Sequence, residues 1–533
     1  MLNKNLLLGD EALALGALHA GITGVYAYPG TPSTEITEFI QQQPLTKERG
    51  IHSEWSCNEK TAMESALGTS YAGKRALVCM KHVGMNVCAD AFINSGVTGA
   101  NGGLVVTACD DPSMHSSQNE QDSRFYADFA MVPCFEPSNQ QEAYSLVREA
   151  FDYSEKFKIP VLMRLTTRMA HSRAVVESGE ARKENELHYP ENQRQWVTLP
   201  ANSIVRGKQL IKDYAEFEKQ SAAMGHNIMI EGKDCSMGII ACGIGYNYLM
   251  ENFPDGCPYP ILKITQYPFP REMAHELARK CKTILVIEEG QPLIEQKLVG
   301  VFETGITIKG RLDGTLPRTG ELSPDCVRVA LGLKPNDTFA PSQVTVPRPP
   351  ALCQGCGHRD FYTALNEAVK DYPAARVFGD IGCYTLGWLA PFHAIHSTVE
   401  MGASLTMAIG AAQAGVWPAI AVIGDSTFTH SGMTGLLDAV NINANITLCI
   451  SDNLTTGMTG GQDSAGTGKL EKICLGMGLD PAHLRVIVPL PANYKEMERI
   501  IKEELEYKGT SVIISRRECI QTARRHAQSK NKK

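Results

Sequence analysis

Two oxygen-bearing side chains follow neighbouring apolar runs in the last third of the chain. Asp425 comes after the run 421–423 and a glycine, and Asn453 follows the run 446–450. If both runs are strands, this carboxylate and this amide could share one Mg²⁺ ion, which prefers oxygen ligands. Gly424 would let backbone amides approach a diphosphate. A Gly-Asp turn and an unrelated asparagine turn would explain the same residues equally well.

The elements that must position these side chains are indicated by apolar runs alternating with amphipathic segments. In residues 1–190 the runs are at 24–28, 76–80, 104–108 and 160–165, with helical patterns at 58–72 and 140–153 between them. In residues 351–522, β-branched runs recur at 376–379, 419–423, 447–450 and 511–515. Strands that alternate with helices are typical of parallel βα units, so we predict an α/β fold.

A smaller α/β block is predicted at 203–345, between two polar segments. Residues 174–202 and the proline-rich stretch 341–350 are predicted linkers. The Gly243-Ile244-Gly245 segment follows an apolar run, but the third glycine of a phosphate loop is missing, so this signal is weak. Residues 523–533 are predicted to form a solvated basic tail.

The composition is that of an ordinary globular chain. The 533 residues are 43% hydrophobic and 20% charged, with a net charge of −7. No global positive field exists to hold nucleic acid or an anionic membrane. We find no apolar run long enough to span a bilayer and no secretory signal at residues 1–9, so we expect a cytoplasmic location. The sixteen cysteines are then expected to be reduced thiols or metal ligands.

Several motifs together resemble one family. Gly424-Asp425-Ser426 followed by Asn453 is similar to the motif that binds thiamine diphosphate (ThDP). Residues 454–462 resemble its version in 2-oxoacid:ferredoxin oxidoreductases. Over residues 1–522 the chain resembles the α subunit of indolepyruvate:ferredoxin oxidoreductase, with matching segments at 28–34, 80–86, 115–122 and 353–358.

The resemblance implies a multi-domain α/β fold with two doubly wound, parallel-sheet ThDP-binding domains. Residues 1–190 would bind the aminopyrimidine, residues 351–522 the diphosphate, and residues 203–345 would form a domain like the C-terminal domain of transketolase. ThDP would lie between the first and third domains. Mg²⁺ would be bound by the side chains of Asp425 and Asn453 and by the backbone carbonyl of Thr455. The remaining cofactor contacts would come from Gly424, Ser426, Gly457 and His358.

The resemblance also implies one [4Fe–4S] cluster beside ThDP. Its ligands would be Cys353 and Cys356 of a Cys-x-x-Cys motif, Cys383, and Cys519, whose assignment depends most on the alignment. Gln354 stands where the family often has proline, which a turn tolerates. Four thiolates also suit structural zinc. Plain buried thiols would explain Cys519 alone but not the Cys-x-x-Cys motif.

The resemblance assigns Glu59 to the carboxylate beside N1′ of the aminopyrimidine, where a buried acid assists proton transfer. Taken alone, Glu59 is equally an ordinary acid complementing a helix N-terminus, with Glu54 and Glu64 as nearby competitors.

Substrate contacts are less defined by the sequence. Thr31 matches the threonine that approaches the substrate carboxylate in pyruvate-using relatives. The arginine of those relatives is replaced by the stretch 107–110, which weakens the case for pyruvate. His115, Lys81 and His82 are candidate polar groups at the site, and each is equally explained as an ordinary loop or strand-end residue.

The partners implied are a smaller γ-type subunit, also called β, in a dimer of heterodimers, and ferredoxin or a similar electron acceptor. No run of closely spaced cysteines typical of the family's C-terminal ferredoxin-like domain occurs in the sequence. Electrons would therefore leave the cluster directly or through a partner.

The predicted function is the oxidative decarboxylation of an aryl pyruvate with CoA to give an aryl-acetyl-CoA and CO₂. One rival is a non-oxidative ThDP-dependent decarboxylase or carboligase, which would keep Glu59, Asp425 and Asn453 but need no cluster. The other is a non-catalytic assembly subunit, which would be expected to have damaged motifs.

Overall fold

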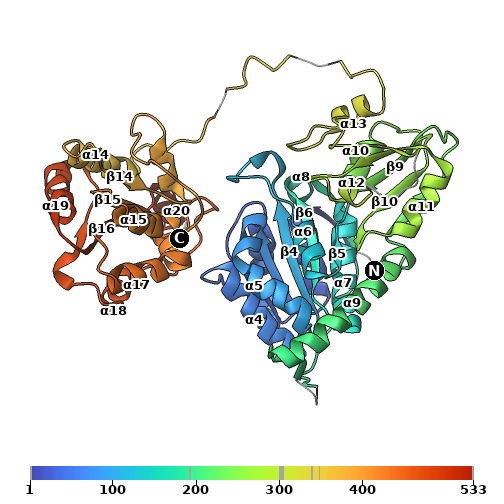
Figure 1. The fold of residues 1–533 in the computed structure, drawn as a ribbon, viewed down its shortest axis with the longest axis horizontal. Helices are drawn as coiled ribbons and strands as arrows, with labels where there is room; N and C mark the ends of the chain where they lie inside the picture. The colour runs from blue at the N-terminus through green and yellow to red at the C-terminus, as the bar shows by residue number, and fades with distance from the viewer. Residues whose placement is uncertain (1–2, 191–193, 299–304, 338–339, 347, 531–533) are drawn as a thin grey trace. The chain divides into compact units, whose positions relative to one another are not determined.

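The computed structural model describes residues 3–190, 194–298, 305–337, 340–346 and 348–530 (Figure 1). Met1, residues 191–193 and Pro347 of the two predicted linkers, and Lys532 and Lys533 of the predicted tail lie outside the described residues. The chain forms two compact units, residues 1–339 and 340–533, and each is described by itself.

The main sheet of the first unit has six strands in the order β11-β5-β6-β4-β3-β2. Neighbouring strands from β2 to β5 are parallel. The four longer ones are β2 (Gly24–Ala27), β3 (Ala76–Lys81), β4 (Leu104–Asp110) and β6 (Val161–Thr166). Every residue of β3, β4 and β6 is buried, as expected for parallel strands covered on both faces.

Helices of the first unit follow the strands and pack on them. Helix α4 (Glu59–Tyr71) contacts β2 and β3, and α5 (His82–Thr98) contacts α4, β3 and β4. Helix α7 (Gln140–Phe157) packs on α1 (Gly9–His19), β4 and β6. The carboxyl ends of β2, β3 and β4 therefore lead into the loops and helix starts that carry the predicted pyrimidine-side residues.

The segment predicted as a linker, 174–202, is partly regular structure. Strand β7 (Arg173–Ser178) pairs antiparallel with β1 (Asn3–Leu8), from the start of the chain. The polar sequence of β7 reflects its place in a two-stranded ribbon, where three of its six residues are exposed. The last residues of the predicted linker begin helix α9 (Pro200–Ala223), which packs on α5.

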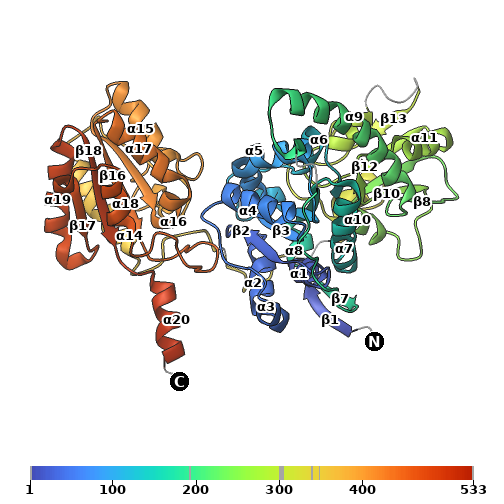
Figure 2. The ribbon, with the colours of Figure 1, turned by 90° about the horizontal axis from the view of Figure 1, so that it is seen from below.

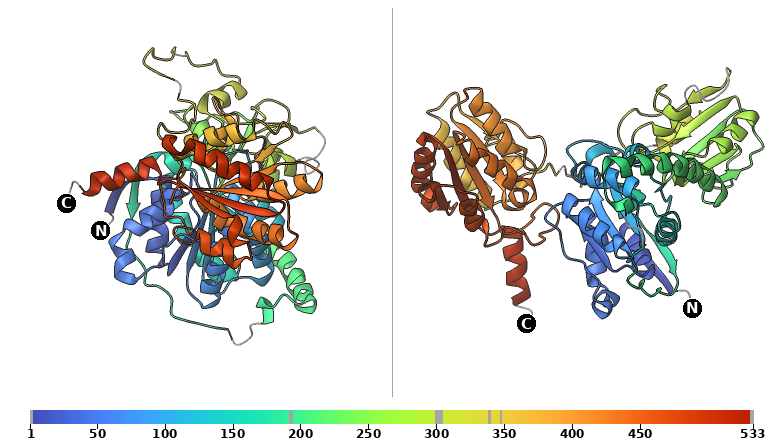
Figure 3. Two further views of the ribbon diagram at one scale, coloured as in Figure 1. Left: turned by 90° about the vertical axis from the view of Figure 1, so that its left-hand side faces the viewer. Right: turned by 60° about the horizontal axis from the view of Figure 1, so that its bottom comes forward.

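A second sheet of five strands in the order β13-β12-β9-β10-β8 completes the first unit (Figure 3, right). Strands β9 (Gly238–Cys242), β10 (Ile261–Ile264), β12 (Thr283–Ile287) and β13 (Thr307–Lys309) run parallel, and β8 (Ile228–Ile230) is antiparallel to β10. Directly after β10, strand β11 (Gln266–Tyr267) pairs with β5 (Cys134–Phe135) of the first sheet. The first two predicted blocks thus share one sheet edge within one unit.

The second unit is a doubly wound parallel sheet in the order β14-β15-β16-β18-β17 (Figure 2). Its strands are β14 (Arg376–Phe378), β15 (Ala419–Gly424), β16 (Ile446–Asp452), β17 (Leu484–Ile487) and β18 (Thr510–Arg516). Along β15, Ile420 and Val422 enter the hydrophobic core with the helices α14 (Gly357–Val369) and α19 (Tyr494–Glu506). Ala421 and Ile423 enter the opposite core with α15 (Ala403–Gln413) and α17 (Met433–Asn441).

The end of the chain is helical rather than an irregular tail as far as it is described. Helix α20 (Ile520–Lys530) includes most of the predicted basic tail, and Figure 2 shows it projecting from the second unit. Arg524 and Arg525 are exposed on it, so the expected solvation of the basic side chains is compatible with the helix.

A search of the described helices for a long, uncharged, apolar stretch found none that would cross a bilayer.

Candidate functional site

The carboxyl ends of β15 and β16 bring Asp425 and Asn453 to one edge of the second unit's sheet. The two strands pair in parallel, with Gly424 opposite Ser451. Asp425 opens the short helix α16 (Asp425–Thr427), and a π-helical turn, Phe428–Gly432, follows it. Turns of this kind are frequent at functional sites.

Asp425 is a buried carboxylate, and one of its two oxygens makes no hydrogen bond to the described residues. That oxygen, Oδ2, is itself buried. Burial and the nearby Asp452 carboxylate together raise the pKa of Asp425 to about 7. A buried acid beside a second acid, with one oxygen unused, is the donor set that a divalent cation satisfies.

The loop that contains Asn453 is tightly constrained. The Thr455 amide donates to Asn453 Oδ1 at 3.1 Å, and the Thr455 hydroxyl donates to the Gln462 carbonyl at 2.9 Å. Leu454 lies between them with φ = 61°, a left-handed conformation that costs a branched residue energy. The hydroxyls of Ser426 and Thr456 share a hydrogen bond of 2.9 Å, so the Asp425 turn and the Asn453 loop touch.

A tyrosine that the sequence did not single out lies over the glycine before Asp425. A Cβ atom on Gly424 would lie 2.7 Å from Tyr384 Cε1, so only glycine fits there. The Tyr384 hydroxyl donates to Asp380, which also accepts from the Ser404 hydroxyl at 2.7 Å. Burial raises the pKa of Asp380 to about 8. No spacing rule links Tyr384 to Gly424, so only the folded chain places one on the other.

The four predicted cluster cysteines line one cavity of about 100 Å³ in the second unit. Asn453, Gly457 and His358 line the same cavity, together with Asp452, Arg517 and other residues near the strand ends. Cys353 is exposed, while Cys356, Cys383 and Cys519 are partly buried. The structure therefore brings together cysteines from three separate segments of the sequence.

The Cys-x-x-Cys segment is a turn that requires its glycine. Gly355 has φ = +78°, and the Cys356 amide donates to the Cys353 carbonyl at 3.1 Å. Cys356 directly precedes α14 and Cys519 directly precedes α20. Helix N-termini favour negative charge, so both positions suit thiolates. The Gln521 side-chain amide donates to Cys353 Sγ at 3.5 Å, a contact the sequence did not suggest.

The cysteine cavity and the Asn453 loop are directly connected. The Cys519 amide donates to the Asn453 carbonyl at 3.0 Å. A Cβ atom on Gly457 would lie 3.2 Å from Cys383 Sγ and 3.6 Å from the Asn453 side-chain nitrogen. The cavity, which Asn453 itself lines, therefore adjoins the Asp425–Asn453 edge directly.

The thiols repel one another as anions. Burial, with the neighbouring Cys356, Cys519, Cys353 and Asp425, raises the pKa of Cys383 to about 12, and burial also raises the pKa of Cys356. His358 is buried, its pKa is lowered to about 4 by burial, and its Nδ1 lies 3.1 Å from Cys356 Sγ. Without a positive centre beside them, the Cys356 and Cys383 thiols stay protonated, so the cavity fits a cationic metal group.

The spacing of the sulfurs distinguishes two kinds of metal group. Thiolates bound to one tetrahedral zinc ion lie about 3.8 Å apart, because each Zn–S bond is about 2.3 Å. Within the described part of the chain, no three of these sulfurs lie within 4.8 Å of one another. A four-iron cluster, with each thiolate on a different iron, suits the wider spacing better.

Glu59 is the first residue of α4 in the first unit. Asn58 caps the helix by accepting a hydrogen bond from the Thr61 amide at 2.8 Å, which fixes Glu59 as the first helical residue. Glu59 is only 5% exposed. A Cβ atom on Gly84, in the first turn of α5, would lie 2.7 Å from Glu59 Cγ, so Gly84 leaves room for the carboxylate. Glu64, a competitor by sequence, is half-exposed and paired with Lys60.

Thr31 and Lys81 belong to one polar cluster at the carboxyl ends of β2 and β3. Lys81 Nζ donates to the Ser116 carbonyl at 2.5 Å, and the Ser116 hydroxyl donates to the Thr31 carbonyl at 3.4 Å. Asp111 accepts from the Ser116 amide at 2.8 Å. Lys81 is 8% exposed, and burial lowers its pKa to about 8. The cluster combines one cation with hydroxyl groups, as a carboxylate ligand requires.

The two candidate histidines lie in different surroundings. His115 is exposed on its loop, with Nε2 3.4 Å from Glu321. His82, the first residue of α5, is completely buried, and neither ring nitrogen has a hydrogen-bond partner among the described residues. Burial lowers the pKa of His82. His82, which directly follows Lys81, is therefore the buried histidine of the two, and His115 is the exposed one.

The stretch 107–110, which replaces the arginine of pyruvate-using relatives, carries one buried acid, Asp110. Asp110, at the end of β4, accepts from Arg164 Nε at 2.6 Å and from the Ser123 amide at 3.0 Å. Asp110 is therefore held by structural partners. Among the described residues, Lys81 is the cation of this cluster that lies beside the Thr31 loop. A Cβ atom on Gly30 would lie 3.1 Å from Lys81 Cβ.

Two family models match the chain, one in each unit. The model described as "Pyruvate flavodoxin/ferredoxin oxidoreductase, thiamine diP-bdg" matches residues 15–228. The model described as "Thiamine pyrophosphate enzyme, C-terminal TPP binding domain" matches residues 380–515. The predicted α/β fold with ThDP-binding-type domains is confirmed by these matches and by the parallel sheets.

Relatives similar over almost the whole chain are indolepyruvate oxidoreductase subunits IorA. The subunit of Archaeoglobus fulgidus is 38% identical over 97% of this chain and 86% of the relative. That of Pyrococcus abyssi is 36% identical over 96% and 85%. Among solved structures, 2-oxoglutarate:ferredoxin oxidoreductase from Magnetococcus marinus aligns with a TM-score of 0.50 and 14% identity. That alignment spans 62% of this chain and 65% of the other, just under two thirds, and shows likeness of fold.

Proposed function

The chain belongs to the family of indolepyruvate oxidoreductase IorA subunits, and from that premise we propose that it is the catalytic subunit of a 2-oxoacid oxidoreductase. Its substrates would be aryl pyruvates of the indolepyruvate type and CoA, and its products an aryl-acetyl-CoA and CO₂. The electrons released would pass to ferredoxin or a similar acceptor. The cofactors would be ThDP, Mg²⁺ and one [4Fe–4S] cluster.

The ThDP and Mg²⁺ assignment is supported by a donor set in each unit. In the second unit, Asp425 has a buried unpartnered oxygen, and Asn453 and Thr455 lie on the adjoining loop. These three residues would hold Mg²⁺, and Gly424, Ser426 and Gly457 would leave room for the diphosphate. In the first unit, buried Glu59 would hold the aminopyrimidine through its N1′ atom.

The observation that carries the oxidative assignment is the shared cavity of Cys353, Cys356, Cys383 and Cys519. Four thiols line one cavity, and among the described residues no three of their sulfurs lie within 4.8 Å of one another, which favours a [4Fe–4S] cluster over a single zinc ion. A non-oxidative decarboxylase or carboligase would have no use for this cavity. Its contact with the Asn453 loop suits electron transfer over a short distance.

When bound, ThDP supplies the electron sink for loss of CO₂, and the cluster supplies a path for single electrons. The protein's own residues position these groups and control charge. Glu59 would exchange a proton with the aminopyrimidine, and its burial keeps the carboxylate from competing water. His358 is neutral near pH 7, because its pKa is about 4, and would donate a hydrogen bond to the Cys356 thiolate.

The substrate carboxylate would bind at the Thr31–Lys81 cluster. Lys81 offers the positive charge that the missing arginine would provide in pyruvate-using relatives, and Thr31 lies on the adjoining loop. His115, predicted from its loop, would act only if substrate binding drew it from Glu321. The aryl side chain of the substrate is inferred from the relatives' names and not from a pocket.

The assembly proposed from the family is a dimer of heterodimers with a smaller subunit, the γ-type or β subunit. The relatives' designation as subunit IorA supports a second subunit. A cytoplasmic location stays a prediction from the sequence.

Metal and sulfide analysis of the anaerobically purified full chain tests this function without an activity assay. We expect about four iron atoms and four sulfides per chain, and a paramagnetic signal after reduction. Both should be lost in Cys353→Ser and in Cys519→Ser. Cys235→Ser is the matched control, because Cys235 is exposed in the first unit and outside the cavity.

Zinc in place of iron, or a well-folded anaerobic protein without metal, would contradict the oxidative assignment. The non-oxidative ThDP-dependent decarboxylase or carboligase would then be the better account. Full cluster occupancy in Cys519→Ser would remove that residue alone from the ligand set.

A further inference from the structure

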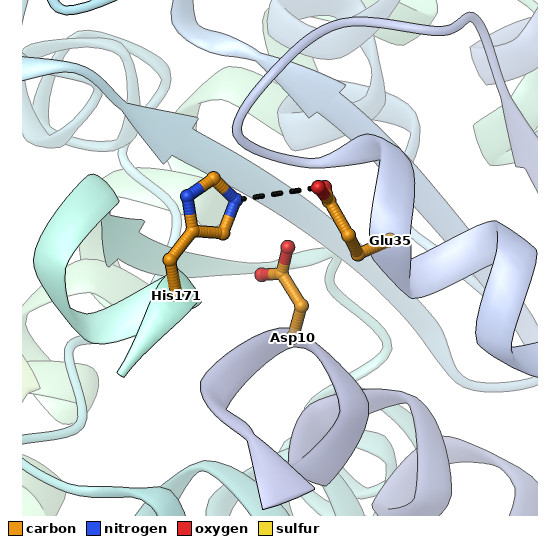
Figure 4. A group of neighbouring side chains, drawn as sticks. All are labelled: Asp10, Glu35 and His171. Atoms are coloured by element: carbon orange, nitrogen blue, oxygen red, sulfur yellow. Dashed lines mark ion pairs between the residues drawn. The ribbon is translucent and has the colours of Figure 1, made fainter. Parts of the chain in front are cut away.

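Three metal-ligating side chains meet in the first unit, away from the residues assigned above. Asp10 lies in the first turn of α1, Glu35 in the first turn of α2 (Thr34–Gln42), and His171 at the end of α8 (Thr167–His171). One ligand atom from each lies within 4.8 Å of the others. Figure 4 shows the three side chains converging, with the Asp10 carboxylate directed between the other two.

Asp10 is the unusual member of this group because it is buried without compensation. Its side chain is completely buried, and among the described residues its Oδ2 atom has no hydrogen-bond partner. In the same part of the chain, its Oδ1 atom accepts a hydrogen bond only from the Cys109 thiol, at 3.9 Å. Within the described residues, no lysine or arginine forms an ion pair with Asp10. An isolated buried carboxylate is costly, so a cation is the expected partner.

Glu35, like Asp10, has a buried oxygen without a hydrogen-bond partner among the described residues. That oxygen is Oε2, whereas Oε1 lies 3.5 Å from His171 Nε2. The group offers a metal ion two carboxylates and one imidazole nitrogen. Burial raises the pKa of Asp10, so a bound cation is what would hold that carboxylate ionised. The side chains of Glu35 and His171 are 36% and 34% exposed, so an ion and its water ligands can reach the site from solvent.

The donor set selects the class of ion. Mg²⁺ and Ca²⁺ prefer oxygen ligands throughout, whereas zinc binds imidazole nitrogen and carboxylate oxygen at about 2.0–2.2 Å. Ligand atoms around one such ion are about 3–4.4 Å apart, so the present spacing needs only small movements. We propose that Asp10, Glu35 and His171 form a site for one divalent transition-metal ion of the zinc class, which fastens α1, α2 and α8 together.

The site would stabilise the loop before α2. Thr34, the residue before Glu35, accepts from the Gly30 amide at 3.0 Å, so the first turn of α2 is tied to the loop that contains Thr31. The third ligand, His171, ends a helix whose first residue, Thr167, donates to Asp111 at 2.7 Å. The ion is a positioning element. Its existence does not depend on the function proposed above.

Zinc binding to the full chain tests the proposal. The protein is treated with chelator, loaded with iron and sulfide, saturated with Mg²⁺ and ThDP, and titrated with Zn²⁺ while bound metal is measured. We expect one more equivalent of Zn²⁺ per chain in the unmodified protein than in Asp10→Asn or His171→Gln. The readout is the difference in bound Zn²⁺ per chain between the unmodified protein and each variant. Zn²⁺ bound at sites that all the proteins share cancels in this difference. Zn²⁺ should raise the unfolding temperature of the unmodified protein but not of these variants.

Glu38→Gln is the matched control, because Glu38 lies one turn after Glu35 on the same helix and outside the group. It should bind the extra equivalent normally. Co²⁺ in place of Zn²⁺ should give d–d absorption without thiolate charge-transfer bands, as expected for nitrogen and oxygen ligands. Equal Zn²⁺ stoichiometry in all four proteins would overturn the proposal. If Asp10→Asn does not fold, the half-exposed His171→Gln decides alone.

Discussion

Glu59 is the residue on which proton transfer to the cofactor would depend. It is buried against Gly84, whereas Glu64 on the same helix is half-exposed and paired with Lys60. We predict that Glu59→Gln lowers kcat by about 10²- to 10⁴-fold, the usual contribution of a positioned acid or base. ThDP binding, measured by calorimetry, should persist because the amide keeps the shape of the side chain.

Glu64→Gln is the control for this substitution, and its kcat should stay within about twofold of the unmodified enzyme, because surface ion pairs contribute little. Equal losses in the two variants would mean that Glu59 has no special role.

Lys81 is the cation expected to hold the substrate carboxylate. Losing a hydrogen bond to a charged group costs about 1.5–3 kcal/mol, so Lys81→Gln should raise the KM for the 2-oxoacid about 10- to 100-fold. Lys60→Gln is the control, because Lys60 is half-exposed on α4. If the KM of Lys81→Gln is unchanged, the carboxylate binds elsewhere.

The pH dependence of substrate binding should report the same residue. Burial lowers the pKa of Lys81 from its ordinary value to about 8, so Lys81 loses its positive charge as the pH rises through about 8. The KM of the unmodified enzyme should therefore rise above pH 8. In Lys81→Gln the KM should be independent of pH over this window, as steady-state kinetics between pH 6.5 and about 9 would show.

At the scale of elements, the Cys-x-x-Cys turn joins a strained backbone to the N-terminus of α14. Gly355 has φ = +78°, and a Cβ atom there would lie 3.1 Å from Ile520 Cδ1 at the start of α20. An alanine in the left-handed region costs about 1–2 kcal/mol. Gly355→Ala should lower both the unfolding temperature and the iron content, because Cys353 and Cys356 move relative to each other.

Gly410→Ala serves as the comparison in the same unit. Gly410 lies inside helix α15, and nothing within 4 Å meets its added Cβ atom. Alanine in a helix interior is favoured by about 0.5–1 kcal/mol, so this variant should unfold at a higher temperature with unchanged iron content. A loss of iron in Gly410→Ala as large as in Gly355→Ala would show that the effect is not local to the turn.

At the scale of the whole molecule, buried charges join the two sheets of the first unit. Arg164, on β6, is completely buried, pairs with Asp110 at 2.6 Å and with Glu136, and donates to the Glu289 carbonyl at 3.0 Å. Glu289 is the second residue after the second sheet's β12. The arginine thus holds together two sheets whose strands are far apart in the sequence.

Arg164→Met should destabilise the first unit by about 3–5 kcal/mol, because it leaves the buried Asp110 carboxylate without its cation and Glu136 with only the more distant Arg124. Calorimetry would detect the lower unfolding temperature, and the iron content of the second unit should be kept. Arg499→Met removes an exposed ion pair with Glu503 and should cost less than about 1 kcal/mol. A similar loss in both variants would contradict a special role for the buried network.

Much of the fold followed from the sequence because its signals are local. Apolar runs separated by helical patterns predict parallel βα units; Asp425 and Asn453 directly follow strands, and Glu59 begins a helix. The departures lie where tertiary contacts overrode composition. The polar segment 173–178 forms β7 because β1 offers it a partner, and the short β11 pairs with the first sheet although it follows a strand of the second.

The sequence by itself determined the family, the α/β class and the residues that resemble cofactor ligands, because short motifs carry their chemistry in residue type and spacing. Only the tertiary structure decided which distant side chains meet. It placed Cys519 in one cavity with Cys353, set Tyr384 over Gly424, and brought Asp10, Glu35 and His171 together. These contacts join residues from tens to well over a hundred positions apart. Chain folding, rather than local spacing, fixes such distances.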